Sequence, residues 1–370
     1  MKKLVIYAIL GVVILIVSMV AVYSFYGKSP IFRSLSSTQD VVDMTGRTVT
    51  VPNDVTRVIA VNSGALRLVT YLDAASMICG IEQHELDLEG RPYAMANPQY
   101  ATLPVIGPQF GGDPELIAAQ KPDVVFTTET DIAKLDALQN QIGIPVIGIV
   151  YGSLNTADAQ QIFYDSLTLI GKVIHSEDRA AEVIAYVKGL INDLNTRTAN
   201  IPDANKPPVY VGGLSARGSH GFTSTSAAYA PFTLTNSKNV ITLEMAKGST
   251  QVVNVDIEAL PSLNPAIIFV DYNGIDLIKE DIQRHKDVYS QLDAIRNGRV
   301  YGVMGYNWYT LNFDVVLTDA YYIGTALYPN QFNDVNPQQK ADEIYTFLCG
   351  APLYDQMVNL YGPFGQVNIT

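Results

Sequence analysis

Short apolar runs alternate with amphipathic stretches along most of the chain. The runs are rich in Val and Ile, which is typical of buried strands. The expected strands are 57–61, 124–126, 145–150, 209–211, 267–270 and 299–303. Before all of them, Val41 to Pro52 has Thr-Gly at its centre and alternating Val residues beyond it, which predicts a hairpin. This alternation indicates an α/β fold with mostly parallel sheets.

One segment breaks the alternation with a long helical pattern. From Ser176 onward, apolar residues recur every three or four positions and form one stripe: Ala180, Val183, Ile184, Val187, Leu190, Ile191 and Leu194. Ser176 is the expected N-cap, and three Pro residues in 201–208 end the helix. A long helix midway along the chain predicts a strut between two domains.

The segments on either side of this helix resemble each other. Glu115 lies seven residues before Pro122, and Glu258 lies seven residues before Pro265; each Pro leads into an apolar strand. A Leu-Asp-Ala motif and a further strand follow in both units, with about 14 extra residues around 273–289 in the second. We therefore expect an N-terminal lobe at 40–155, linker helices at 156–200 and a C-terminal lobe at 201–370.

The N-terminus carries a different signal. Leu4 to Tyr26 contains no charged residue, and Lys2 and Lys3 precede it. A helix of that length is about 34 Å long, enough to cross a bilayer, and the two Lys would keep its start in the cytoplasm. We expect 1–27 to be a membrane anchor and 28–39 a tether, with the rest extracytoplasmic. A cleaved signal peptide, leaving a secreted or periplasmic protein, is the alternative.

Composition narrows the class of protein. The chain of 370 residues has 36 acidic and 24 basic residues, a net charge of -12. All four basic residues before residue 34 precede the first acid, Asp40, so the remainder carries 20 basic and 36 acidic residues, a net charge of -16. That balance argues against nucleic-acid binding. Cys79 and Cys349 cannot form a disulfide framework or a four-Cys zinc site; buried free thiols are expected, with a mutual disulfide as the alternative.

Several motifs resemble one family when taken in order. They are Asp43-x-x-Gly46-Arg47-x-Val49-x-Val51-Pro52 with Arg57-Val58-Ile59, then Tyr71-Leu72-Asp73 to Cys79-Gly80-Ile81, then Leu169-Ile170-Gly171 through Glu177-Asp178-Arg179-Ala180. In this order they resemble the class III, long-helix substrate-binding proteins of ABC importers for ferric siderophores, haem and cobalamin. The resemblance is clear to about residue 200 and looser beyond. The chain departs from many bacterial relatives because no lipobox Cys follows its apolar run.

The resemblance implies two Rossmann-like lobes joined by a single long backbone helix, and a binding protein rather than an enzyme. It implies an ABC permease and its ATPase as partners, a monomer, and no intrinsic cofactor. The ligand would be an iron- or cobalt-containing chelate held between the lobes. Glu115 and Glu258 match the surface Glu residues, one on each lobe, that dock on the permease in that family.

Loops after the expected strands supply the candidate ligand-binding residues, because ligands bind beyond the carboxyl ends of such strands. Gly212–Phe222 is Gly-rich but lacks the P-loop and dinucleotide spacings. Arg91 and Arg217 suit an anion, His220 suits a metal or a hydrogen bond, and the aromatic run 306–309 suits ring stacking. The full candidate set is Asn62, Glu82, Arg91, Tyr93, Phe110, Arg217, His220, Phe222, Tyr306, Asn307, Trp308 and Tyr309.

Three other functions stay open at this level. An oxyanion-binding protein of the molybdate or tungstate type has the same fold, and a membrane-anchored ligand sensor has the same parts. A hydrolase is the third: Ser215, His220 and Asp271 can be arranged as a triad, although no Gly-x-Ser-x-Gly elbow occurs.

Overall fold

The computed structural model describes residues 37–370. The expected anchor, 1–27, and nearly all of the tether, 28–39, lie outside the described residues. Within 37–370, no helix is both long and apolar enough to cross a membrane.

The first part of the described chain builds a three-stranded parallel sheet in the order β3-β4-β5. Strands β3 and β4 are buried at every position, which explains their unbroken apolar sequence. The elements are β1 (Thr38–Val42), β2 (Thr48–Pro52), β3 (Val58–Val61), α2 (Ala65–Tyr71), η1 (Ala75–Met77), η2 (Gln83–Leu86), α3 (Pro92–Met95), η3 (Pro98–Thr102), α4 (Pro114–Ala119), β4 (Val124–Thr127), α5 (Ile132–Ile142) and β5 (Val146–Gly148).

The predicted hairpin is the two-stranded sheet β1-β2. Its turn depends on Asp43, whose Oδ1 accepts from the backbone N–H groups of Thr45 and Arg47 at 3.0 Å each. Arg47 Nη1 then donates to the carbonyl of Val146 at 3.1 Å, which fastens the hairpin to β5. The Asp43-x-x-Gly46-Arg47 motif therefore forms a turn, and its Arg anchors the hairpin to β5. Gly46 has a φ of 85°, a backbone conformation that favours glycine.

Two long helices follow, α6 (Ala157–Ile174) and α7 (Glu177–Thr198). Five residues of the predicted stripe on α7 are buried, namely Ala180, Val183, Val187, Leu190 and Leu194, and the other two, Ile184 and Ile191, are half-buried against the same core. Ser176 occupies the N-cap position of α7, but its side chain makes no capping hydrogen bond.

The second lobe has a five-stranded sheet in the order β12-β11-β10-β6-β8, parallel except for β12 at the edge. The residues predicted as an insertion are mostly helical, in η6, α10 and α11. The elements are η4 (Asp203–Asn205), β6 (Pro208–Gly212), β7 (Ser224–Thr225), α8 (Ala230–Leu234), β8 (Lys238–Asn239), β9 (Val253–Asn254), η5 (Ile257–Ala259), α9 (Leu260–Leu263), β10 (Ile267–Asp271), η6 (Tyr272–Gly274), α10 (Ile275–Arg284), α11 (Lys286–Tyr289), α12 (Asp293–Arg296), β11 (Val300–Val303), α13 (Phe313–Leu327), α14 (Pro337–Cys349), α15 (Tyr354–Tyr361) and β12 (Gly365–Gln366).

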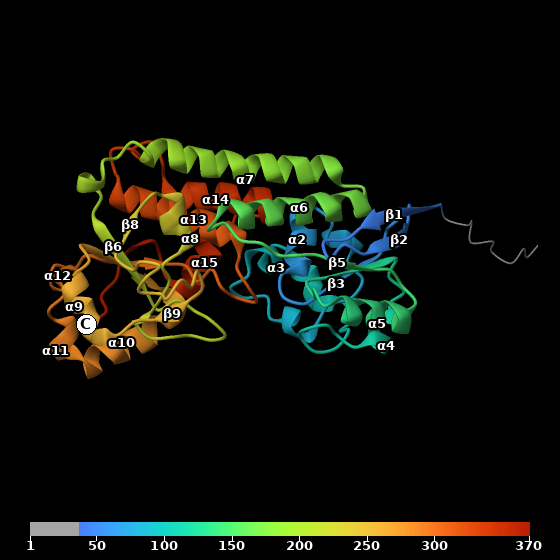
Figure 1. The fold of residues 1–370 in the computed structure, drawn as a ribbon, viewed down its shortest axis with the longest axis horizontal. Coiled ribbons are helices and arrows are strands. Elements are labelled where there is room, and N and C mark those ends of the chain that lie inside the picture. The colour runs from blue at the N-terminus through green and yellow to red at the C-terminus, as the bar shows by residue number, and fades with distance from the viewer. Residues whose placement is uncertain (1–36) are drawn as a thin grey trace, which may run out of the picture. The chain divides into compact units, whose positions relative to one another are not determined.

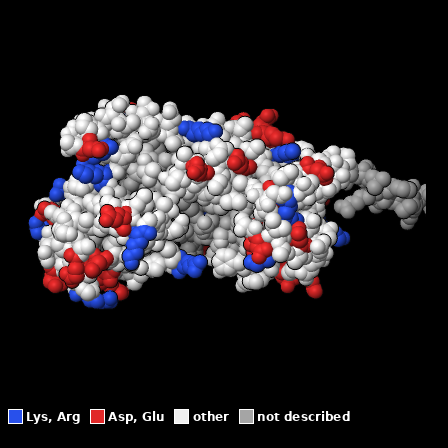
Figure 2. Space-filling model, in the orientation of Figure 1, with Lys and Arg blue, Asp and Glu red and all other residues white. Residues whose placement is uncertain are grey.

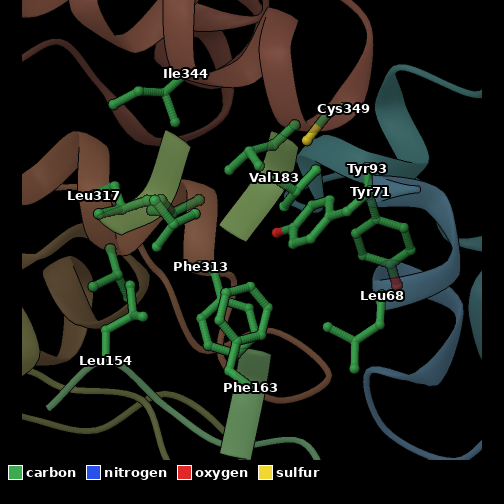
Figure 3. Close-up of a cluster of buried hydrophobic side chains, with 14 of the residues drawn as sticks. Leu68, Tyr71, Tyr93, Leu154, Phe163, Val183, Phe313, Leu317, Ile344 and Cys349 are labelled. Carbon is green, nitrogen blue, oxygen red and sulfur yellow. The ribbon is translucent and has the colours of Figure 1, made fainter. Parts of the chain in front are cut away.

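The two lobes share a hydrophobic core through a layer of helices. Helix α7 runs along both lobes (Figure 1) and contacts α6 and α13, while α14 packs on α13 and also on α2 and α3. One buried cluster contains Phe126 from the first sheet, Val187 from α7 and Phe269 from the second sheet. Figure 3 shows part of this cluster, with Phe163 of α6 against Phe313 of α13 at 4.0 Å between ring centroids. The fold prediction of two α/β lobes joined by a long helix is confirmed.

Both cysteines are buried free thiols, so the disulfide alternative is wrong. Burial raises the pKa of each thiol, which keeps both protonated and unreactive. Cys349 donates through Sγ to Asp314 Oδ2 at 3.2 Å, beside Tyr71 in Figure 3.

Candidate functional site

The loop after β11 crosses from the second lobe to the first. We call residues 305–312 the bridging loop. Its Tyr309 hydroxyl donates to Glu82 Oε2 at 2.5 Å. Its backbone carbonyls at Trp308 and Leu311 accept from the guanidinium of Arg67 at 3.1 and 2.8 Å. The two lobes are therefore joined across their strand ends by one ordered loop.

On the first lobe, the carboxylate of Glu82 accepts the hydrogen bond from Tyr309. Its side chain is buried, and its carboxylate also accepts from the backbone N–H groups of Asn62 at 3.1 Å and Gly111 at 2.7 Å. Burial raises the pKa of Glu82, while the three hydrogen bonds oppose that shift. Phe110 is 64% exposed beside this contact, with its ring 5.9 Å from that of Tyr309. The structure thus brings together four predicted residues, Asn62, Glu82, Phe110 and Tyr309.

Arg67 was not among the predicted residues. It has no exposed surface, and its guanidinium lies 4.7 Å from the ring centre of Tyr93 and 5.6 Å from that of Tyr151. The Tyr151 hydroxyl accepts from Arg67 and donates to the carbonyl of Leu311. The available signal was a single charge within the apolar run Ala65–Tyr71, because a buried charge requires a specific partner.

Replacing Arg67 by Met is expected to free the bridging loop. The carbonyls of Trp308 and Leu311 each lose their hydrogen bond from the guanidinium, so the unfolding free energy should fall by about 2–3 kcal/mol. Trp308 is the only tryptophan, so its fluorescence reports directly on the loop and should shift to longer wavelength before global unfolding in urea. Arg284→Met, at an exposed position on α10, is the control. Unchanged emission and an unchanged urea midpoint would contradict this role of Arg67.

Other predicted residues belong to the protein interior. Arg91 and Tyr93 are fully buried, and both bind Glu85 Oε2, at 2.9 and 2.7 Å. Phe222 is also fully buried, stacked 5.3 Å from Tyr210 between ring centroids. We therefore leave Arg91, Tyr93 and Phe222 out of the proposed site, since none of them has surface to offer a ligand.

The Gly-rich loop after β6 lies next to the bridging loop. Asn307 Nδ2 donates to the carbonyl of Ser215 at 2.6 Å. Arg217 is exposed, and a ring nitrogen of His220 lies 2.7 Å from the carbonyl of Ala216. The buried Ser215 hydroxyl has no hydrogen-bond partner among residues 37–370, so within this part of the chain Ser215, His220 and Asp271 do not form the hydrogen-bonded relay of a triad.

Two cavities lie on either side of the bridging loop. The first, which we call the neutral cavity, has a volume of about 270 Å³. No charged side chain of residues 37–370 lines it. The lining residues are Gly152, Ser153, Asn155, Ser226, Ala228, Ala230, Thr250, Gln251, Val252, Tyr306, Asn307, Thr310 and Leu311. The second, the acidic cavity, has a volume of about 200 Å³. It is lined by Asp87, Glu89, Gly90, Asn273, Trp308, Leu360 and Tyr361.

Two carboxyl groups are enclosed in the second lobe near the base of the bridging loop. Asp271 Oδ1 accepts from the N–H of Asn273 at 2.9 Å, and Asp319 Oδ1 accepts from the N–H of Met304 at 3.1 Å. The second oxygen of each has no partner among residues 37–370. Burial raises the pKa of Asp271 to about 7 and raises that of Asp319 well above its usual value.

The two predicted docking residues occupy matching local structures. Glu115 lies in the first turn of α4 and Glu258 in η5, and both are exposed. Two residues earlier, Asp113 and Asp256 cap these turns by accepting from the Glu N–H at 2.9 and 3.0 Å. On the face drawn in Figure 2, acidic and basic side chains are interspersed, without a continuous basic surface.

In the described part of the chain, no group of three or more His, Cys, Asp or Glu side chains is arranged to hold a metal ion. A family model described as periplasmic binding protein matches residues 62–305. The chain belongs to this family. The match covers β4 and β5 of the first sheet, helices α6 and α7, and strands β6, β8, β10 and β11 of the second sheet, and it ends at the first residue of the bridging loop.

The similar proteins are binding proteins by name. A periplasmic solute-binding protein of Veillonella parvula has a TM-score of 0.70 at 22% identity, over 88% of this chain and 97% of that one. The molybdate-binding protein MolA of Haemophilus influenzae is 22% identical over 82% of this chain and 89% of its own length. The structure of MolA bound to molybdate has a TM-score of 0.65 at 20% identity, over 85% of this chain and 98% of that one. The Fe(3+)-citrate-binding protein YfmC of Bacillus subtilis is 25% identical over 52% of this chain and 57% of its own. At these identities the structural likeness shows the fold.

Proposed function

We propose that this periplasmic binding protein is the extracytoplasmic solute-binding component of an ABC importer. It takes up a small metal-containing anion between its lobes and presents it to the permease. The observation that carries the proposal is the bridging loop, which divides the interlobe region into two cavities that each take residues from both lobes. The related proteins support the ligand class, because molybdate and ferric citrate are both metal-containing anions.

The size of the cavities favours a small ligand within that class. Sites for drug-sized ligands commonly occupy about 300–1,000 Å³, and both cavities lie below that range. Ferric citrate therefore suits the structure better than haem or a corrinoid, which are two of the three chelates expected from the sequence. Residues 1–27 would hold the protein at the outer face of the membrane. A permease and an ATPase as partners distinguish this function from a membrane-anchored sensor, which would signal instead of releasing its ligand.

Thermal unfolding of the full chain tests the proposal. The protein is heated with molybdate, ferric citrate, haem or cobalamin, each in excess. A ligand at 100 times its dissociation constant adds about 2.7 kcal/mol to the free energy of unfolding. We expect the melting temperature to rise with one of the two anions. Stabilisation by none of the four, together with hydrolysis of generic esters that Ser215→Ala abolishes, would overturn the proposal in favour of an enzyme.

A further inference from the structure

We propose that the neutral cavity is the ligand site and that it selects a small tetrahedral oxyanion without a bound proton. This deepens the proposed function by naming the ligand class and the residues that hold it. Four chain segments form the site: the loop after β5, the segment after β7, residues 250–252 and the bridging loop. Two of the four follow the carboxyl ends of parallel strands, where α/β sheets bind ligands.

Hydrogen-bond donors without partners line this cavity. Among the described residues, the hydroxyls of Tyr306 and Thr310 and the side-chain amide nitrogen of Asn155 donate to no protein group, although each can. Tyr306 is only 9% exposed, so its hydroxyl has little access to solvent. Burial raises the pKa of Tyr306, with the Asp271 and Asp319 carboxyls as further causes, so the phenol stays protonated as a donor. A ligand that accepts hydrogen bonds fits this arrangement.

The cavity attracts an anion without a basic side chain. Helix α6, 18 residues long, begins two residues after Asn155, and the positive end of its dipole favours negative charge there. Gly152 holds the preceding loop against this helix: a Cβ on it would lie 2.6 Å from the carbonyl oxygen of Ala159. The acidic cavity is the opposite case, because Asp87 and Glu89 repel anions.

The absence of a lining carboxylate sets the protonation state of the ligand. The proton of hydrogen phosphate is best accepted by a carboxylate, and among residues 37–370 no Asp or Glu lines the neutral cavity, whose acceptors are neutral amide and hydroxyl oxygens. Molybdate and sulfate carry no proton near neutral pH, so all of their oxygens can accept. A buried donor left without an acceptor is costly, and the site therefore discriminates against phosphate by that unpaired proton.

The test is calorimetric titration of the full chain with molybdate, sulfate, phosphate and ferric citrate. We expect one molybdate per chain and phosphate at least about ten-fold weaker, which corresponds to one mispaired hydrogen bond. Tyr306→Phe and Thr310→Val should each weaken molybdate about ten-fold, and Thr310→Ser should restore it. Tyr361→Phe, in the acidic cavity, is the matched control and should bind as the wild type does.

The outcomes separate this inference from the proposed function. Tight binding of ferric citrate with no binding of molybdate or sulfate would overturn the inference and leave the proposed function standing. Equal affinity for phosphate and molybdate would overturn the selection by protonation state. Loss of binding in Tyr361→Phe but not in Tyr306→Phe or Thr310→Val would place the ligand in the acidic cavity and refute the site. Two independent hydroxyl variants keep the test valid if one of them does not fold.

Discussion

Replacing Glu115 and Glu258 together by Lys is expected to abolish ligand uptake while ligand affinity stays unchanged. Both carboxylates are exposed on capped turns, one on each lobe, and neither forms an ion pair within residues 37–370. Neither lines the neutral or the acidic cavity. If they contact basic residues of a permease, charge reversal turns two attractions into two repulsions at one interface.

Uptake is measured in cells that express the permease and ATPase with either the wild type or the variant, and affinity is measured on the purified chain. Each single variant should lose part of the uptake, because the other lobe still docks. Glu177→Lys is the matched control, since Glu177 is also an exposed Glu in a first helical turn. Normal uptake by the double variant, or a loss of affinity equal to the loss of uptake, would refute the docking role.

Replacing Asp271 by Asn is expected to make the protein progressively more stable than the wild type as the pH rises. The folded-state pKa of Asp271 is raised to about 7, from an ordinary value near 3.9 in the unfolded chain. Because folding raises this pKa, the protonated carboxyl of Asp271 contributes its full stabilisation below pH 4. That contribution is lost as the pH rises through 7. At about 1.36 kcal/mol per pH unit, Asp271 then costs the wild type about 4 kcal/mol by pH 8.

Asn keeps the acceptor for the Asn273 N–H and cannot ionise, so the variant escapes this loss. The groups that face Asp271 are the carboxyl of Asp319 and the phenols of Tyr229, Tyr306 and Tyr361. All remain in the variant, so the difference in unfolding free energy between variant and wild type isolates Asp271. Urea titrations between pH 4 and 8 measure it, with Asp276→Asn on the surface of α10 as the control. A difference that does not change with pH would show that Asp271 is ionised in the folded protein throughout.

The regular elements were predictable wherever the sequence pattern was local. The strands around Val58, Val124 and Ile267 are runs of β-branched residues buried on both faces, and the α7 stripe has helical spacing. No element was predicted after residue 312. Helix α13 shows why: thirteen of its fifteen residues are buried, so it has no polar face and no periodic pattern.

The site was less predictable, because it depends on distant segments that meet. The bridging loop was recognised from its aromatic run, yet its partner Arg67 lies 244 residues before Leu311. Residues 250–252, in the wall of the neutral cavity, carry no local signal of function. Phe222 shows how far position alone can carry such a prediction. It follows a strand and a Gly-rich loop, but its large apolar ring is buried beside Tyr210, where it gains more from burial than from exposure.

The shared helical layer limits how this architecture can be divided. Helices α13 and α14 belong to the C-terminal part of the chain, but Tyr71 of α2 donates to Asp314 of α13 at 2.7 Å, and Asn97 Nδ2 lies 3.4 Å from the carbonyl oxygen of Cys349. An engineer who exchanged the second lobe for that of another binding protein would expose the apolar faces of α2, α3 and α7. In a working chimera, the incoming α13 and α14 would have to be repacked against the α2, α3 and α7 that remain. The loop that joins the lobes is therefore not the natural point of recombination.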